Sequence, residues 1–264
     1  MDSIENKTVW ITGASSGIGE ALAYELSTEG CRLVLSSRNR GELERVKAGC
    51  EHPEKVTVIP LDVTDFDALP EKMTEAVAAF GGIDVLINNA GISQRSLIED
   101  TDFEVYRQLM DVNYLGTVAL TKAVLPHFTD RKQGHFVTVS SLMGKFGTPL
   151  RSGYCGSKHA LHGFFDVLRM EHEKDGIAVT IVCPGFIRTD IAKKALTGDG
   201  SPQQQEDNAT QNGMPVQQCA RKIVRAIKKE KFEVYIGGKE TSGAYLKRIF
   251  PKLLHKIILR SKVT

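Results

Sequence analysis

Short apolar runs rich in β-branched residues recur along the chain, and longer stretches with apolar residues at helical spacing lie between them. The runs predict seven strands, at Val9–Thr12, Arg32–Ser36, Val56–Pro60, Val85–Asn88, His135–Ser140, Ala178–Val182 and Phe232–Ile236. The intervening stretches predict helices at Gly17–Glu29, Gly41–Gly49, Ala68–Phe80, Phe103–Phe128, Gly153–Lys174 and Val216–Lys229. Strands that are mostly apolar and alternate with helices indicate a parallel sheet covered on both faces. We therefore expect one α/β domain with a doubly wound, seven-stranded parallel sheet.

One internal segment departs from this alternation. Leu196–Met214 is rich in Gln, Asn, Asp and Gly, and a stretch of that length without regular structure is typical of a functional lid or a disordered insert. We find no domain-scale linker and no internal repeat. The expected organisation is a single domain over residues 1–240, with a long loop at about 190–215, followed by a tail over residues 241–264.

A glycine-rich turn joins the first predicted strand to the first predicted helix. Glycines let the backbone turn sharply and approach a pyrophosphate, and the helix N-terminus supplies free N–H groups. The spacing is Gly-x-x-x-Gly-x-Gly, and glycines alone would equally suit a tight strand–helix turn. Their position after the first strand favours dinucleotide binding in a Rossmann-type sheet. The expected cofactor contacts in this turn are Gly13, Ser15, Ser16, Gly17, Ile18 and Gly19.

The end of the second predicted strand bears on which dinucleotide is bound. An acidic residue at this place would bind the ribose 2′-hydroxyl of NAD, but the chain has Ser37 followed by Arg38. A hydroxyl and a guanidinium can hydrogen-bond a 2′-phosphate, which a carboxylate would repel. The pair therefore favours NADP(H) over NAD(H), unless Arg38 is only a solvated charge after a strand.

The spacing Tyr-x-x-x-Lys occurs twice, as Tyr154/Lys158 and as Tyr235/Lys239. The first pair begins a long helical pattern, where positions i and i+4 share one face, and it follows Ser141 by 13 residues. The second pair ends a strand and is followed by two glycines, so its spacing does not place the two side chains on one face. A phenol with a pKa of about 10 needs a nearby cation to work near neutrality. Tyr154/Lys158 is the expected site, and the second pair is taken as chance.

These pieces together resemble the short-chain dehydrogenase/reductase family. The match covers roughly residues 5–240 and is similar to the branch that includes the dehydrogenase/reductase member 7B-like proteins. The order and spacing of these motifs together are specific for the family, although most of the motifs taken singly are not. They are Thr12 to Gly19, Leu61-Asp62-Val63, Asn88-Asn89-Ala90-Gly91, Asn113, Ser140-Ser141, Tyr154-Cys155-Gly156-Ser157-Lys158 and Pro184-Gly185.

The resemblance implies a hydride transfer between NADP(H) and a carbonyl or secondary alcohol. In it Tyr154 exchanges a proton with the substrate oxygen, while Ser141 hydrogen-bonds that oxygen. Lys158 lowers the pKa of Tyr154 and reaches the nicotinamide ribose, and Asn113 supports a water-linked proton path. Ser140 competes with Ser141, and the spacing to Tyr154 favours Ser141.

The resemblance also assigns further cofactor contacts. Asp62 is expected at the adenine, with capping of the following helix as the alternative. Many NADP-using members carry a basic residue where this chain has Ser16, so the NADP(H) preference depends mainly on Arg38. With Tyr154 and Lys158, the remaining implied contacts are Val63, Asn89, Ala90, Gly91, Pro184, Gly185, Ile187 and Thr189.

Substrate selection in such folds lies in loops beyond the carboxyl ends of the strands. The expected contributors are Ser93, Gln94, Met143, Phe146 and Phe186, with the loop at about 190–215 as a lid. Three of these are apolar and favour an apolar substrate, although each also suits a core position. The rival function is a dinucleotide-binding sensor or scaffold without turnover. A family epimerase or dehydratase would need extra segments for which 264 residues leave no room.

Charge is close to balanced overall, with 34 Lys and Arg against 32 Asp and Glu for a net charge of +2. That balance argues against a nucleic-acid binder. The five cysteines form no CxxC or Cys/His cluster, which indicates buried thiols in a reducing compartment and no metal site. With neither a secretory signal nor an apolar run long enough for a transmembrane helix, we expect a cytoplasmic protein.

The tail carries the excess of positive charge. Residues 247–262 hold six basic residues and no acidic one, among apolar residues at helical spacing: Leu246, Ile249, Phe250, Leu253, Leu254, Ile257 and Ile258. Pro251 interrupts this pattern unless a new helix starts there. Three roles stay open: peripheral membrane contact, packing on a sister subunit, or a cover over the substrate cleft. By resemblance, a homodimer or homotetramer would form through the helices near Phe103–Phe128 and Gly153–Lys174.

Overall fold

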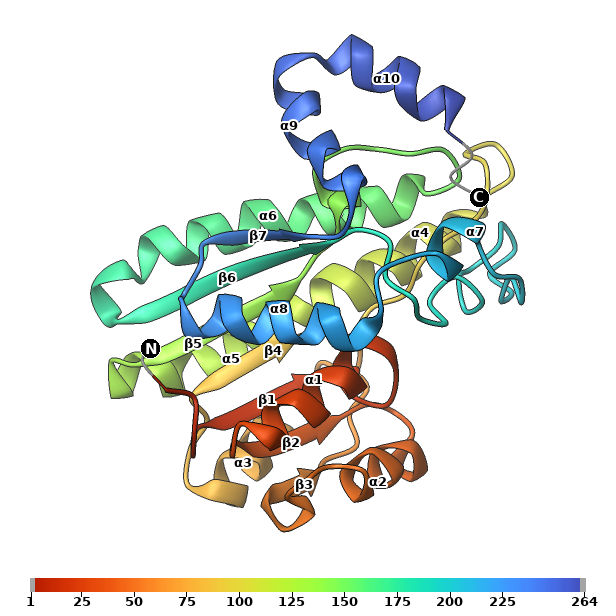
Figure 1. The fold of residues 1–264 in the computed structure, drawn as a ribbon. Coiled ribbons are helices and arrows are strands. Elements are labelled where there is room, and N and C mark those ends of the chain that lie inside the picture. Colours follow the sequence, from red (N-terminus) through yellow and green to blue (C-terminus); the bar gives the residue numbers. More distant parts are fainter. Residues whose placement is uncertain (1–2, 262–264) are drawn as a thin grey trace.

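The computed structural model describes residues 3–261 and has a parallel sheet of seven strands at its centre (Figure 1). The strand order is β3-β2-β1-β4-β5-β6-β7, with every neighbouring pair parallel. This order confirms the predicted doubly wound sheet. The strands are β1 Thr8–Thr12, β2 Arg32–Ser36, β3 Val56–Val58, β4 Val85–Asn88, β5 Gly134–Val139, β6 Ile177–Pro184 and β7 Glu233–Ile236.

Helices cover both faces of the sheet, and most begin and end within two or three residues of the predicted positions. The exception is the predicted helix at Phe103–Phe128, which a single π-helical turn at Asp111–Leu115 divides. The helices are α1 Gly17–Thr28, α2 Arg40–Ala48, α3 Leu69–Phe80, α4 Phe103–Met110, α5 Gly116–Arg131, α6 Ser152–Glu171, α7 Asn208–Gln211, α8 Val216–Lys228, α9 Ser242–Ile249 and α10 Pro251–Arg260.

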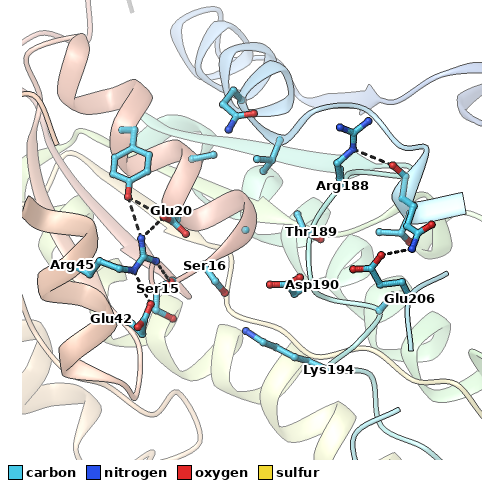
Figure 2. A pocket seen from close by; sticks show the side chains of 18 of the residues that line it. Ser15, Ser16, Glu20, Glu42, Arg45, Arg188, Thr189, Asp190, Lys194 and Glu206 are labelled. Carbon is cyan, nitrogen blue, oxygen red and sulfur yellow. Dashed lines mark hydrogen bonds and ion pairs between the residues drawn. The ribbon is translucent and has the colours of Figure 1, made fainter. Parts of the chain in front are cut away.

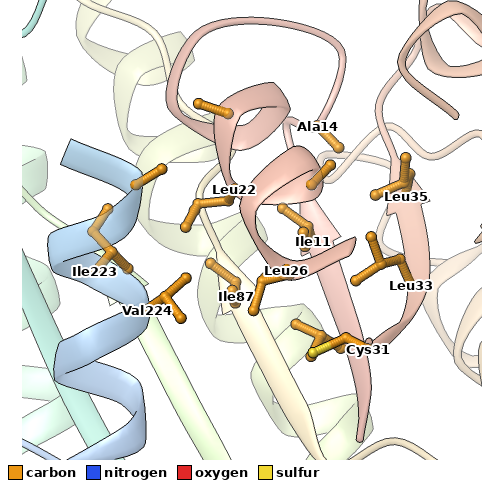
Figure 3. Packing of buried hydrophobic residues seen from close by; sticks show 14 of the residues in the cluster. Ile11, Ala14, Leu22, Leu26, Cys31, Leu33, Leu35, Ile87, Ile223 and Val224 are labelled. Atoms are coloured by element: carbon orange, nitrogen blue, oxygen red, sulfur yellow. The ribbon is translucent and has the colours of Figure 1, made fainter. Parts of the chain in front are cut away.

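The core consists of two layers because successive strand residues point to opposite faces of the sheet. On one face, Ile11 and Leu33 pack with Leu22 and Leu26 of α1 and Ile223 of α8 (Figure 3). On the other face, residues such as Trp10 and Phe136 pack against α3, α5 and α6. All five cysteines are buried and unpaired, as predicted.

The polar segment 196–214 is an ordered part of the domain and not a disordered insert. Leu196 forms a β-bridge with Gln94 and another with Pro202, and Met214 forms one with Ile187. The short helix α7 lies within the segment. The segment is thus held in place by tertiary contacts that no local sequence pattern predicts.

The tail forms two helices, α9 and α10, which stand above the sheet (Figure 1). Pro251 is the first residue of α10, the position at which a proline costs no backbone hydrogen bond. Among the described residues, no helix is long and apolar enough to cross a lipid bilayer.

Candidate active site

The strand order reverses between β1 and β4, and such switch points place a ligand crevice at the carboxyl ends of the strands. The glycine-rich turn lies there and depends on its glycines. Gly13 has φ +63°, and a Cβ on it would come within 2.9 Å of the Cα of Ala90. A Cβ on Gly19 would collide with the carbonyl oxygen of Gly13. The turn therefore tolerates no side chain at these two positions.

Hydrogen bonds from the β4 end hold the turn in place. Asn89 donates from Nδ2 to the carbonyl oxygens of Thr12 (3.0 Å) and Gly13 (3.2 Å). In return, the Thr12 hydroxyl accepts from the N–H groups of Asn89 (3.0 Å) and Ala90 (3.1 Å). Ser16, at the N-cap of α1, does not cap the helix with its side chain. The first-turn N–H groups of α1 are thus left for an anionic ligand.

A cavity of about 880 Å³ extends from this turn to the residues after β6 (Figure 2). Gly17 and Thr189 face each other across it, since a Cβ on Gly17 would lie 3.4 Å from Cγ2 of Thr189. Arg45 of α2 lines the cavity, donating to the Ser15 carbonyl oxygen (3.3 Å) while paired with Glu20 (2.7 Å). The turn, the helix N-terminus and this cavity fit a pyrophosphate.

Sequence reasoning missed the cations of this cavity. Arg45, Arg188 and Lys194 all line it, although none belongs to a recognisable motif. Arg188 donates from Nε to the carbonyl oxygen of Gln211 at 3.0 Å, which ties the loop after β6 to α7. Only the tertiary arrangement brings these side chains to one cavity.

The end of β2 also fits a ligand. The hydroxyl of Ser37 is buried and has no hydrogen-bond partner in the described chain, which is an arrangement that a ribose substituent could satisfy. Arg38 is exposed beside it and is not among the cavity residues, whereas Asn39 is. Asp62 accepts from the N–H (2.9 Å) and hydroxyl (2.7 Å) of Thr64. Asp62 therefore closes a local turn and does not cap α3, whose N-cap is Ala68.

Tyr154, Lys158 and Ser141 meet at the carboxyl end of β5. The first two lie one turn apart on α6, with Nζ of Lys158 5.9 Å from the centre of the Tyr154 ring. The side chain of Ser141 lies close enough to Tyr154 to act on its pKa, and its hydroxyl also donates to the Pro184 carbonyl oxygen at 3.4 Å. Ser140 instead donates to the carbonyl oxygen of Lys158 (3.0 Å) and contacts His162 (3.1 Å). The structure thus brings Ser141, and not Ser140, to the tyrosine.

Burial and neighbouring charges shift the pKa values of Tyr154 and Lys158. Burial raises the pKa of Tyr154, and the Ser141 side chain acts against that rise, as do the charges of Arg95 and Arg151. Burial also lowers the pKa of Lys158 from 10.5 to about 8, while its ammonium donates to the Val139 carbonyl oxygen at 2.8 Å. Two arginines that sequence reasoning missed thus also favour the ionised form of Tyr154.

Asn113 is fully buried on the π-helical turn. Its amide donates to the Ile92 carbonyl oxygen (3.0 Å) and to the Ser157 hydroxyl (2.9 Å), and its Oδ1 accepts from the Ile92 N–H (2.8 Å). Gly91 separates it from Lys158, because a Cβ there would lie 3.0 Å from Oδ1 of Asn113 and 3.4 Å from Nζ of Lys158. Asn113 thus sits one small residue away from the ammonium.

A buried carboxylate holds the two arginines in place. Asp207 accepts hydrogen bonds from Nε of Arg95 (2.9 Å) and from Arg151 (3.1 Å), and all three side chains are at most 7% exposed. Burial raises the pKa of Asp207, but the two arginines outweigh it and lower that pKa overall. We call these three residues the Asp207 clamp. It joins the loop after β4, the polar segment and the start of α6.

The expected substrate residues divide into two groups. Gln94 is fully buried and accepts through Oε1 from the N–H groups of Gly153 (2.8 Å) and Tyr154 (3.3 Å), so its side chain caps the start of α6. Ser93 is buried and accepts from Arg95 (2.9 Å). Phe146 is buried against α9 at Gly243.

Met143 and Phe186 are less buried than the other expected substrate residues. Met143 is partly buried and packs beside Tyr154, and Phe186 is partly buried after the Pro184-Gly185 turn. Glu240 accepts from the Phe186 N–H at 3.2 Å and lies close to Gly185. The second Tyr-x-x-x-Lys pair takes no part, because Tyr235 lies in β7 and packs edge-on against Tyr245.

A doubly wound sheet with a phosphate-binding turn at its switch point, next to a buried Ser, Tyr and Lys, defines an oxidoreductase-type α/β fold. Comparison with known proteins agrees. The short chain dehydrogenase family model matches residues 7–199. The chain therefore belongs to the short-chain dehydrogenase/reductase family of oxidoreductases.

Similar curated proteins carry related names. Human dehydrogenase/reductase SDR family member 7 is 45% identical over 239 residues, covering 88% of this chain and 70% of that protein. The mouse member 7B is 40% identical over 261 residues, covering 97% of this chain and 81% of its own length. The predicted similarity to the 7B-like branch is confirmed.

Solved structures share the fold. A short-chain dehydrogenase/reductase from Burkholderia phymatum, determined in complex with NAD, superposes with a TM-score of 0.83 at 22% identity, covering 100% of this chain and 98% of that one. A short-chain dehydrogenase from Streptomyces avermitilis has a TM-score of 0.80 at 29% identity, covering 97% and 98%.

Proposed function

We propose that this protein transfers a hydride between NADP(H) and a ketone or secondary alcohol. The observation that carries the proposal is the meeting of Tyr154, Ser141 and Lys158 beside the crevice at the β1/β4 switch point. A family member could also bind a dinucleotide without turnover, but every side chain needed for proton transfer is present and buried here.

The chain's own residues would act on the substrate oxygen. In the reductive direction, Tyr154 donates its phenolic proton to that oxygen, and Ser141 donates a hydrogen bond to it as negative charge develops. Lys158 offers a cation beside the tyrosinate that is left, and Asn113 lies next to Lys158 on the inner side. A bound nicotinamide cofactor supplies the hydride.

The residues present fit NADP(H) better than NAD(H). Ser37 offers an unsatisfied hydroxyl and Arg38 an exposed guanidinium at the end of β2, where no carboxylate stands. Both side chains can hydrogen-bond a 2′-phosphate. The proposal keeps all the cofactor contacts expected from the sequence. They lie in the glycine turn, at Asp62 and Val63, at Asn89 to Gly91, and at Pro184, Gly185, Ile187 and Thr189.

Two further elements belong to it. Met143 and Phe186 beside the cleft support an apolar substrate. Exposed apolar side chains on the long helices, Phe103 of α4 and Val167 and Met170 of α6, support a homodimer or homotetramer formed through them.

The test is NADPH oxidation measured against a panel of ketones, aldehydes, steroids, retinoids and acyl thioesters. Replacing Tyr154 by Phe should lower kcat by about 10³-fold while NADPH still binds. Tyr235→Phe is the matched control and should keep its activity. An active Tyr154→Phe variant would refute the mechanism, and NADPH binding without turnover of any substrate would favour the sensor.

A further inference from the structure

The apolar residues of the tail divide between two sides. Leu254 is only 5% exposed and packs into the core layer below, with Leu246 and Ile258 partly buried beside it. Ile249, Phe250, Leu253 and Ile257 of the same pattern are between 45% and 66% exposed. The body of the protein therefore covers one side of α9 and α10 and leaves a second apolar side uncovered.

The same two helices carry exposed cations interspersed in sequence with these apolar residues. Lys247, Arg248, Lys252, Lys256 and Arg260 are all exposed, and none of them forms an ion pair in the described part of the chain. No acidic residue occurs between positions 247 and 262. We call the exposed apolar residues and these five cations the tail face.

The tail face is presented by an anchored element. A Cβ on Gly243 would come within 2.9 Å of the Phe146 ring, so α9 begins in direct contact with the loop that follows Ser141. Tyr245 packs edge-on against Tyr235 of β7, with ring centres 5.4 Å apart. Leu254 then fixes α10 to the same core layer. The two tail helices are thus already ordered in the folded protein, so that binding through the tail face would lose little further conformational entropy.

We propose that the tail face docks on a lipid bilayer that contains anionic lipids. Exposed Phe, Leu and Ile side chains can enter the interface between headgroups and acyl chains, while lysines and arginines next to them meet lipid phosphates. The inference depends on the tail alone and is independent of the proposed reaction.

Charge favours a bilayer over a second copy of the chain. In a two-fold dimer the same patch meets itself, so five unpaired cations would face five others across the contact. An anionic bilayer instead offers negative charge and an apolar interior to one continuous face. The tail face therefore matches a lipid surface and repels its own copy.

The experiment is co-sedimentation of the full chain with vesicles of phosphatidylcholine alone or of phosphatidylcholine mixed with phosphatidylserine. Binding to the mixed vesicles is expected to exceed binding to the neutral ones and to weaken as salt is raised. A charge variant, Lys247→Gln with Lys252→Gln and Lys256→Gln, should lower the partition coefficient by about 100-fold. Its control, Lys122→Gln with Lys229→Gln and Lys231→Gln, removes three exposed cations elsewhere and should bind as the wild type does.

An apolar variant tests the other half of the face. Ile249→Gln with Leu253→Gln and Ile257→Gln should reduce binding by about tenfold or more, whereas Leu97→Gln with Ile98→Gln, which are exposed apolar residues outside the tail, should not. Unchanged melting temperatures show that the variants fold. The proposal is overturned if the wild-type protein does not bind the mixed vesicles. It is also overturned if the tail variants bind them as strongly as the wild type does. A wild-type oligomer that the tail variants dissociate, without vesicle binding, would instead assign the face to a second copy.

Discussion

Arg151 donates a hydrogen bond to Asp207 across 3.1 Å, and this contact joins two positions that lie 56 residues apart. Arg151 is the N-cap residue of α6, three residues before Tyr154, and Asp207 precedes α7 in the polar segment. The segment that lines the cleft and the helix that carries the tyrosine are thus one connected unit.

Removing the carboxylate of the Asp207 clamp should destabilise the protein strongly. Asp207→Asn leaves two buried guanidinium groups without their anion, and loss of one partner from a buried pair costs about 3–5 kcal/mol. Asp199→Asn changes an exposed carboxylate in the same segment, leaves no charge buried without a partner, and should destabilise the protein far less. Urea unfolding measures both variants, and equal losses would contradict a special role for Asp207.

The lowered pKa of Lys158 makes stability depend on pH in a defined direction. Between the folded pKa of about 8 and the free value of 10.5, the unfolded chain holds the proton that the folded protein has lost. Unfolding free energy should therefore rise as pH increases from 8 to 10.5, by at most about 3 kcal/mol from this group. The difference between wild type and Lys158→Met, taken by urea unfolding at several pH values, isolates the effect. A pH-independent difference would show that Lys158 is not perturbed.

Cofactor discrimination should depend on Arg38. Replacing it by Ala removes a charge-assisted hydrogen bond to a 2′-phosphate, so the affinity ratio of NADPH to NADH should fall by about tenfold or more. Arg40→Ala, a nearby exposed cation held only by an exposed ion pair to Glu44, should leave the ratio unchanged. Arg45→Gln should weaken both dinucleotides alike, because Arg45 supports the phosphate turn at Ser15. Fluorescence titration separates these outcomes.

Gly91 should limit the geometry between Asn113 and Lys158. Gly91→Ala places a methyl group 3.0 Å from Oδ1 of Asn113 and 3.4 Å from Nζ of Lys158, which displaces one of them. We expect kcat to fall by about 10- to 100-fold with little change in melting temperature. Gly163→Ala is the control, since its Cβ meets nothing within 4 Å on α6. It should raise stability by about 0.5–1 kcal/mol and keep kcat.

The strands and most helices could be predicted because their signal is local. Buried parallel strands are continuous apolar runs, and the helices between them repeat apolar residues on one face. The sequence left open whether Pro251 interrupts the tail helix or starts a new one, and the structure shows that α10 starts there, where proline fits a first helical position. The π-helical turn could not be foreseen, because Asp111–Leu115 carries the same apolar spacing as the helices around it.

Site residues could be predicted where their spacing along the chain indicates their role. They could not be predicted where only the folded structure brings them together. The spacing of 13 positions from Ser141 to Tyr154 favoured the serine that the structure brings to the tyrosine. Gln94 was assigned to substrate, yet it caps α6, because nothing in the sequence shows which polar side chain meets a distant helix end. The Asp207 clamp could not be predicted from the sequence either, because Asp207 and Arg95 lie 112 positions apart.

The π-helical turn at Asp111–Leu115 has a consequence for insertions and deletions in the gene. Its wider hydrogen-bond ring accommodates one residue more than a regular turn, so that α4 and α5 on either side keep the phase of one continuous helix. Deleting a single residue there would restore a uniform helix without rotating α5, whereas a deletion in the first residues of α5 itself would rotate the rest of that helix by about 100° and carry Leu120 and Val124 out of the core. A one-residue deletion should therefore preserve the packing of α5 when it falls in this turn and disrupt it when it falls at the start of α5.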